Sequence, residues 1–475
     1  MTFNSLSFAV FFGVVFCLYQ LPFAWAARKG MLLVASYGFY AAWNPPFIGL
    51  LFLSTVIDWV AARQIAVSST SAIRRLWLLI SLCTNLGLLG FFKYGNFALE
   101  NVAPLMRAVG IEYAPAPFNV ILPWGISFYT FQSMSYTIDI YRGEMKPWDS
   151  FLDFALFISF FPQLLAGPIM RGHDFLPQCV SPPTVSSRQV GWGLSLFILG
   201  VFLKTVVSDT LLAPVVDTVY ADPIPSGMLS AWCAAFGFSG QLYCDFCGYS
   251  TCAIGLGMCL GFSLPDNFNS PMASIGIADF WQRWHITLSS WFRDYVFFPL
   301  GGSRHGAVRT CINLFVTVVL VGLWHGAAWT FVMFGVAHGI LLILDFVIRS
   351  TPVARFNIWR PLPFQFGLAV LTFVIVTLTA VIFRSQSIAQ AGVIFRSMFG
   401  LNDGTAPVNL DSADITIVIV TVEILFLFHF LTRKMTIEAA VSRVPWWGQS
   451  LALAGMLLAI FFSGTADRAF IYFAF

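Results

Sequence analysis

The chain carries few charged residues. Its 475 residues include 25 Lys and Arg and 22 Asp and Glu, so charged residues make up 10% of the composition, against about 25% in a soluble domain. The net charge of +3 forms no basic run, which excludes the electrostatic footprint of a nucleic-acid-binding protein. Apolar residues reach 58%, with 51 Phe and 16 Trp. The sequence therefore predicts an all-α polytopic membrane protein.

Several catalytic and metal-binding signatures are absent. The sequence has no Gly-x-Ser-x-Gly elbow, His-Glu-x-x-His pair, phosphate loop or Cys/His cluster with zinc spacing. It gives no support for a serine hydrolase, a zinc peptidase or a P-loop enzyme, and no bound metal is expected. Cys244 and Cys247 have the spacing of a redox or metal half-site, but suitable further ligands are missing. We expect them to pack as small apolar residues.

Long apolar segments fill most of the chain. A transmembrane helix needs about 20 mostly apolar residues. Candidate segments lie near 5–26, 30–44, 46–63, 75–92, 118–140, 151–170, 190–212, 227–262, 311–324, 327–349, 364–384, 413–432 and 448–465. Proline breaks the chain at 44–46 and 161–168, and broken helices at membrane depth are buried in protein or line a cavity. We expect about 11 membrane helices plus re-entrant and interfacial pieces, within a single integral membrane domain, 1–475, whose motifs concentrate in 241–339.

The N-terminal segment predicts the orientation of the first helix. An apolar run extends to about residue 27, and no basic residue precedes it as a secretory signal would require. Arg28 and Lys29 follow the run. Because basic residues favour the cytoplasmic side, we expect an uncleaved first helix with its N-terminus outside.

Two of the six histidines, His285 and His325, lie in segments rich in Trp and apolar residues. An ionisable group in such a setting tends to face a cavity and to carry function. His285 belongs to 277–302, where large apolar residues recur at helical spacing and Arg283 interrupts them. This pattern predicts one amphipathic interfacial helix. From residue type alone, a hydrogen bond from His285 to a backbone carbonyl is the more common explanation.

His325 follows a short apolar span and is flanked by Trp324 and by small residues. Its residue type fits a catalytic role and close helix packing equally well. His338 follows 13 residues later, and we expect it on the same helix in a packing or supporting role. His173, His305 and His429 have no comparable context and are expected to be structural.

A histidine without a nucleophile or metal partner can still catalyse direct transfer between two bound substrates. A buried imidazole can remove the proton of a hydroxyl as that hydroxyl attacks an activated acyl carbon. A transporter or channel for a glycan or acyl carrier, without chemistry, remains the alternative, because broken helices and intramembrane charge fit it too. The absence of a visible internal repeat counts against a transporter.

Longer motifs carry a family resemblance. They lie at 122–132, 141–143, 160–168, 241–257, 264–269, 281–285, 293–302 and 470–475. In order, these segments resemble the membrane-bound O-acyltransferase (MBOAT) family, and most closely its bacterial alginate O-acetyltransferase (AlgI-type) branch. The resemblance runs through nearly the whole chain. It departs at Thr251, where relatives in this branch usually carry an acidic residue.

The resemblance implies a function and a site. His325 would be the general base, and His285 would assist by orienting the acceptor or stabilising charge. Helices would surround a central funnel and tunnel, with an acyl thioester, such as acetyl-CoA or an acyl carrier, entering from the cytoplasmic side. The acceptor would be an extracytoplasmic polysaccharide, and separate periplasmic proteins would complete acetylation. The location would be the bacterial inner membrane.

Four residues are candidates for supporting roles. Asp245 is an intramembrane carboxylate that could order the site or form an ion pair with Arg283 or Arg293. Arg283, Trp284 and Trp324 immediately adjoin the two histidine positions or lie within two residues of them.

Overall fold

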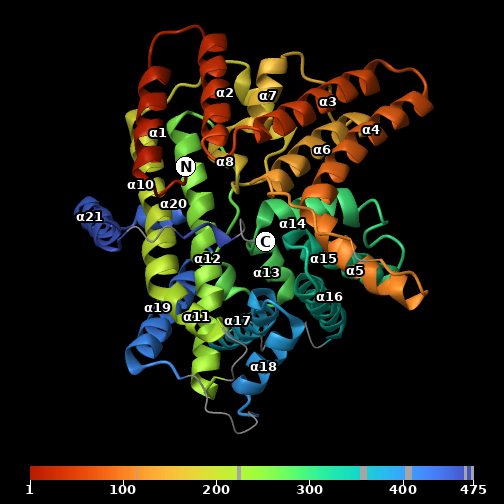
Figure 1. Ribbon diagram of the computed structural model, residues 1–475. Coiled ribbons are helices and arrows are strands. Elements are labelled where there is room, and N and C mark those ends of the chain that lie inside the picture. The colour runs from red at the N-terminus through yellow and green to blue at the C-terminus, as the bar shows by residue number, and fades with distance from the viewer. Residues whose placement is uncertain (114, 222–225, 353–360, 402–408, 465–467, 472–475) are drawn as a thin grey trace. The chain divides into compact units, whose positions relative to one another are not determined.

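A computed structural model describes the chain except for residues 114, 222–225, 353–360, 402–408, 465–467 and 472–475. All regular elements with bounds in the described residues are helical (Figure 1), which confirms the all-α prediction. Most of the C-terminal motif, 472–475, lies outside the described residues. The chain forms two compact units, one of Met1–Phe197 with Cys252–Pro265, the other of Ile198–Thr251 with Asp266–Phe475.

Within its described residues, the first unit contains nine complete α-helices. These are α1 (Leu6–Tyr19), α2 (Trp25–Ala41), α3 (Phe47–Val67), α4 (Ser71–Leu89), α5 (Gly95–Ala108), α6 (Ile126–Arg142), α7 (Phe151–Ser159), α8 (Phe161–Leu164) and α9 (Gly172–Phe175), with the π-helix η1 (Gly90–Tyr94) and the 3₁₀-helix η2 (Leu176–Cys179). Two helices, α10 (Ser187–Phe202) and α12 (Met228–Cys259), have residues in both units.

The second unit holds the remaining elements. These are η3 (Leu203–Leu212), α11 (Ala213–Tyr220), η4 (Pro271–Ala273), α13 (Ile277–Arg283), α14 (Ile286–Phe292), η5 (Arg293–Phe297), α15 (Ala307–His325), α16 (Trp329–Ser350), α17 (Leu362–Arg384), α18 (Ile388–Met398), α19 (Ser412–Thr432), α20 (Ile437–Val441) and α21 (Trp446–Phe462).

Seven segments of the described chain are long and apolar enough to cross a membrane. They are Phe47–Val67, Ser71–Ala108, Ser187–Tyr220, Ala307–His325, Trp329–Ser350, Leu362–Arg384 and Ser412–Thr432. The apolar helices α1 and α21 are shorter. The polytopic prediction is confirmed, but length and composition identify fewer spans than expected. One reason is the break in 151–170, where α7 ends at Ser159 and the four-residue α8 contains Pro162.

Lys29 does not lie in a loop, although the predicted orientation of the first helix treats it as a basic residue that follows the apolar run. It lies in α2, is 8% exposed, and its Nζ is 2.5 Å from a carboxylate oxygen of Asp153. The same nitrogen donates a hydrogen bond to the carbonyl oxygen of Cys179 at 3.0 Å. A buried cation requires such partners. Lys29 therefore cannot support the predicted orientation as a basic loop residue, and the orientation stays a prediction.

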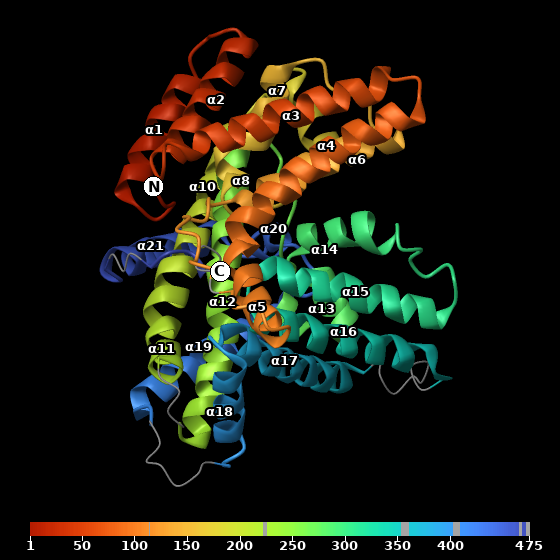
Figure 2. The same ribbon diagram turned by 45° about the vertical axis from the view of Figure 1, so that its right-hand side comes forward.

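A buried polar cluster joins α3, α4 and α6, which lie side by side (Figure 2). The fully buried carboxylate of Asp58 accepts hydrogen bonds from Ser81 Oγ at 2.5 Å, from Asn85 Nδ2 at 2.8 Å and from Ser133 Oγ. Because a buried polar group is costly without partners, these bonds fix the register of the three helices.

In the second unit, α15 and α16 form a tight antiparallel hairpin (Figure 1). Glycines allow the close approach. A Cβ on Gly335 would lie 2.9 Å from the carbonyl oxygen of Val318 and 2.9 Å from Val319 Cα, and one on Gly322 would lie 2.7 Å from Gly335 Cα. These neighbours are backbone atoms, which cannot rotate away. Small residues at such contacts let helix backbones touch.

We predict that Gly335→Ala destabilises the protein by about 1–3 kcal/mol, because the added methyl group forces the two helices apart. The thermal unfolding midpoint of the detergent-solubilised protein should fall. Gly367→Ala on α17 is the matched control, since nothing lies within 4 Å of its added Cβ. Equal midpoints for the two variants would contradict the packing argument.

Candidate active site

His325 is the last residue of α15. The helix ends there because Gly326 is extended, with φ −166° and ψ 156°. A Cβ at Gly326 would overlap the ring of Phe331, so this close turn requires glycine. The imidazole of His325 is 2% exposed. Its centroid lies 5.1 Å from the ring of Trp324 and 5.3 Å from the ring of Phe383.

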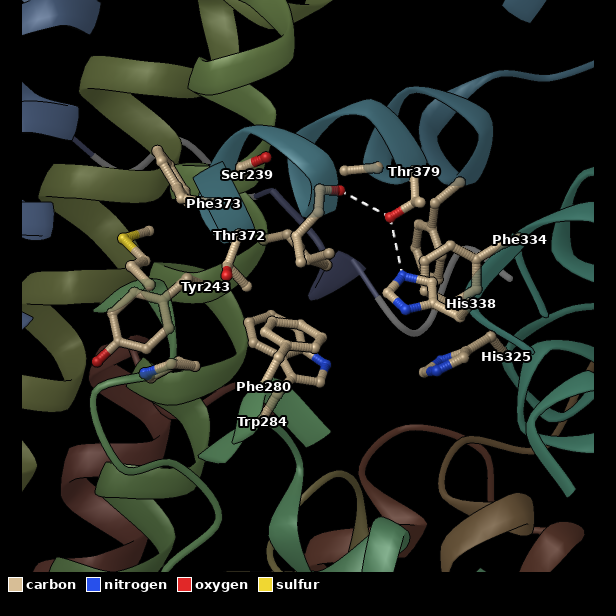
Figure 3. Close-up of a pocket in the computed structure, with 16 residues that line it drawn as sticks. Ser239, Tyr243, Phe280, Trp284, His325, Phe334, His338, Thr372, Phe373 and Thr379 are labelled. Carbon is tan, nitrogen blue, oxygen red and sulfur yellow. Dashed lines mark hydrogen bonds between the residues drawn. The ribbon is translucent and has the colours of Figure 1, made fainter. Parts of the chain in front are cut away.

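His325 lines a narrow cavity within the second unit (Figure 3). The free volume is about 50 Å³, which holds more than one water-sized group. The lining residues are Ser239, Leu242, Tyr243, Pro271, Met272, Phe280, Trp284, His325, Phe334, His338, Thr372, Phe373, Val376, Thr379, Ala380 and Phe383. Apolar walls with a few polar groups are typical of small-molecule sites.

His285 interrupts the interfacial helix that the sequence predicted. The structure has two short helices, α13 and α14, and His285 lies between them with a left-handed backbone, φ +44°. A non-glycine residue in this conformation needs tertiary contacts that compensate for the strain. The prediction of one continuous helix is therefore wrong, because its periodicity does not reveal this turn.

Asn267 supplies the partner of His285. His285 Nδ1 lies 3.1 Å from Asn267 Oδ1, which also accepts hydrogen bonds from the backbone N–H and the hydroxyl of Thr287. Asn267 Nδ2 donates to Ser250 Oγ at 3.1 Å. Since the amide oxygen can only accept, Nδ1 of His285 carries the proton and Nε2 carries the lone pair. The partner is thus a side-chain amide and not the backbone carbonyl suggested by residue type.

Trp324 connects the two predicted site histidines. Its ring lies 5.6 Å from that of His285 and 5.1 Å from that of His325, centroid to centroid. His285 is fully buried. Burial lowers the pKa of His285 well below its ordinary value, and the nearby His325 lowers it further. His285 is therefore neutral at pH 7, with Nε2 able to accept a hydrogen bond.

His338 belongs to the same cavity as His325, although its expected role was packing or support. It lies on α16 and not on the helix of His325, because the chain turns between Gly326 and Ala328. His429 has a structural role, as expected: its Nδ1 accepts a hydrogen bond from the backbone N–H of Met272 at 3.2 Å.

Asp245 pairs with neither arginine proposed from the sequence. Its carboxylate forms an ion pair with Lys204, and it accepts a hydrogen bond from the backbone N–H of Ile471 at 2.9 Å. Arg283 instead pairs with Asp279 at 2.8 Å, and Arg293 with the adjacent Asp294 at 2.8 Å. The pairing prediction is wrong because Lys204 lies 41 residues earlier on η3, which no local pattern indicates.

The three remaining supporting candidates lie in three different settings. Trp284 forms part of the cavity wall, whereas Trp324 is buried and contacts both histidines. Arg283 contributes to an ion pair and is not a lining residue. Two residues that hydrogen-bond to the buried histidines, Asn267 and Thr379, were not predicted from the sequence. Asn267 lies in the 264–269 motif, but no pattern of neighbouring residues indicates that it contacts His285.

The described part of the chain contains no group of three or more His, Cys, Asp and Glu side chains placed to hold a metal ion. Cys244 and Cys247 are buried and unbridged. Thr251, at the position where the sequence departs from the family pattern, donates a hydrogen bond to the carbonyl oxygen of Cys247 at 2.7 Å, within its own helix.

Comparison with known proteins identifies relatives across most of the chain. A probable alginate O-acetylase of Azotobacter vinelandii is 38% identical over 423 residues, covering 88% of this chain and 81% of the relative. A peptidoglycan O-acetyltransferase of Helicobacter pylori is 36% identical, covering 79% and 74%. A teichoic acid D-alanyltransferase of Bacillus subtilis is 29% identical, covering 48% and 59%.

The family model of the membrane-bound O-acyltransferases matches residues 141–385, a range that contains His285, His325 and His338. The match and the similarity to the alginate O-acetylase agree with the multi-pass helical architecture. The chain therefore belongs to the membrane-bound O-acyltransferase family and is an O-acyltransferase.

Proposed function

We propose that this enzyme transfers an acetyl group from a thioester donor to a hydroxyl of an extracytoplasmic polysaccharide, with His325 as general base and His285 assisting. The observation that carries the proposal is the pair of buried imidazoles that both contact the ring of Trp324, one of them in the cavity wall. The named activities of two relatives, alginate O-acetylase and peptidoglycan O-acetyltransferase, support acetyl and a polysaccharide.

The proposed reaction needs one proton acceptor. His325 removes the proton of the acceptor hydroxyl as its oxygen attacks the thioester carbonyl carbon. The new C–O bond forms, the C–S bond breaks, and the protonated imidazole returns its proton to the leaving thiolate. Atoms and charge balance without a covalent enzyme intermediate.

His285 has a narrower role than the sequence suggested. Because Asn267 holds the proton of His285 on Nδ1, the lone pair on Nε2 can accept a hydrogen bond but cannot donate one to an oxyanion. Nε2 can therefore orient the acceptor by accepting from a second hydroxyl, since the proton of the attacking hydroxyl goes to His325. This role fits the tautomer better than stabilisation of negative charge.

We also propose the cellular setting. The donor, acetyl-CoA or an acyl carrier, approaches from the cytoplasmic side of the bacterial inner membrane, and separate periplasmic proteins complete acetylation. The polytopic architecture supports a position that both substrates can reach. The relatives described above all carry acetylase or transferase names, which favours chemistry over the alternative of a transporter.

His325→Ala should lower kcat by about 10²–10⁴-fold, the contribution of a general base. The measurement is acyl transfer by detergent-solubilised protein whose thermal midpoint matches that of the wild type. His173→Ala is the control, because His173 lies exposed in the other unit. Full transfer by a folded His325→Ala protein would refute the role of the base.

Asn267→Asp should raise the pKa of His285 by about 1–3 units, so that transfer is lost at a higher pH on acidification. A carboxylate beside Nδ1 raises the pKa of His285, so the imidazole becomes protonated, and unable to accept a hydrogen bond, at a higher pH than in the wild type. Asn269→Asp adds the same charge on an exposed side chain two residues away. Identical shifts in the two variants would remove His285 as the cause.

Cells that carry His325→Ala should lose O-acetyl groups from a surface polysaccharide while still exporting the polymer. Mass spectrometry of surface glycans from matched wild-type and variant cells measures both quantities. Loss of exported polymer, with normal acetylation of the polymer that still reaches the surface, would instead support a transporter.

A further inference from the structure

His338 is a fully buried histidine in the wall of the His325 cavity. Aromatic rings hold its imidazole in place, with centroids at 4.4 Å for Phe334 and 5.2 Å for Trp281. Figure 3 shows His338 and His325 on the same side of the cavity, across from Tyr243. Nothing in the mechanism above uses this residue.

A short chain of hydrogen bonds fixes the tautomer of His338. Its Nε2 lies 2.8 Å from Thr379 Oγ1, and Thr379 Oγ1 lies 2.7 Å from the carbonyl oxygen of Val376 (Figure 3). A carbonyl can only accept, so the single hydroxyl proton of Thr379 is directed to Val376. The hydroxyl oxygen then accepts from His338, which places the imidazole proton on Nε2.

The other nitrogen, Nδ1, consequently carries a lone pair. It is buried, and no described residue donates a hydrogen bond to it. A buried acceptor without a donor is unfavourable, and such atoms in native proteins often mark functional positions. In Figure 3 the edge of the ring that bears both nitrogens faces the cavity.

We propose that His338 is a substrate-binding residue whose Nδ1 accepts a hydrogen bond from an O–H or N–H group of a substrate bound in the His325 cavity. The inference rests on the proposed acetyl transfer and adds a second polar contact to the same site. Both substrates offer suitable donors: the polysaccharide has hydroxyl groups, and acetyl-CoA has amide N–H groups in its thioester arm.

Two amide substitutions separate this role from a structural one. In His338→Asn, the side-chain oxygen can occupy the position of Nδ1, but the contact with Thr379 is lost. In His338→Gln, the amide nitrogen can replace Nε2 and keep the contact with Thr379, but no acceptor remains at the position of Nδ1. His338→Phe keeps a ring and removes both nitrogens.

The experiment measures kcat and KM for acetyl-CoA and for an alginate oligosaccharide, with each variant matched to the wild type in thermal midpoint. We expect KM for one substrate to rise about tenfold in His338→Gln and His338→Phe, and to stay near the wild-type value in His338→Asn. A rise confined to the oligosaccharide assigns the hydrogen-bond donor to the acceptor substrate, and a rise confined to acetyl-CoA assigns it to the acyl donor.

The opposite order, with His338→Gln normal and His338→Asn impaired, would overturn the proposal in favour of a structural bond to Thr379. Wild-type KM values in all three variants would also overturn it, because a bound water and not a substrate would then donate the hydrogen bond to Nδ1. If the wild-type protein turns over neither substrate, acetyl transfer to these substrates fails. Calorimetric titration with acetyl-CoA and with the oligosaccharide then tests His338 separately, since equal affinities for wild type and His338→Gln would refute the contact.

Discussion

A neutral imidazole buried among apolar side chains needs a hydrogen-bonding partner, and the partner of one ring nitrogen decides the chemistry of the other. In the second unit, Asn267 holds the proton of His285 on Nδ1, whereas Thr379 holds that of His338 on Nε2. His429 accepts a backbone N–H at Nδ1, which uses its lone pair inside the fold. The three histidines are similarly buried, but they differ in which ring nitrogen can accept a hydrogen bond from another group.

The glycine contacts of α15 and α16 place two of the site residues. His325 ends one helix and His338 lies in the other. Two residues that are 13 positions apart in the sequence therefore line the same cavity. The same helices bring Phe334 and Trp324 against the imidazoles. Close packing between the helices is therefore a condition for the site as well as for stability.

Sequence patterns predicted features that depend on composition or on neighbours along the chain. The low charge indicated a polytopic membrane protein, and the position of His325 in an apolar, Trp-rich segment identified a residue that lines a cavity. The turn at His285 was not predictable, because its left-handed backbone is held by Asn267, 18 residues earlier. Periodicity assigns a helix across that point, since it contains no information about tertiary hydrogen bonds.

Asp245 lies outside the cavity, but a series of contacts connects it to His285. Lys204 pairs with Asp245 and also with Asp209, and the Asp245 carboxylate accepts a hydrogen bond from the backbone N–H of Ile471. The neighbouring Phe470 packs against Phe246, with centroids 5.7 Å apart. Phe246 in turn meets the ring of His285 at 4.6 Å, nearly perpendicular to it. Asp245 thus binds the segment that packs against the aromatic neighbour of His285, whereas its expected role in ordering the site stays a prediction.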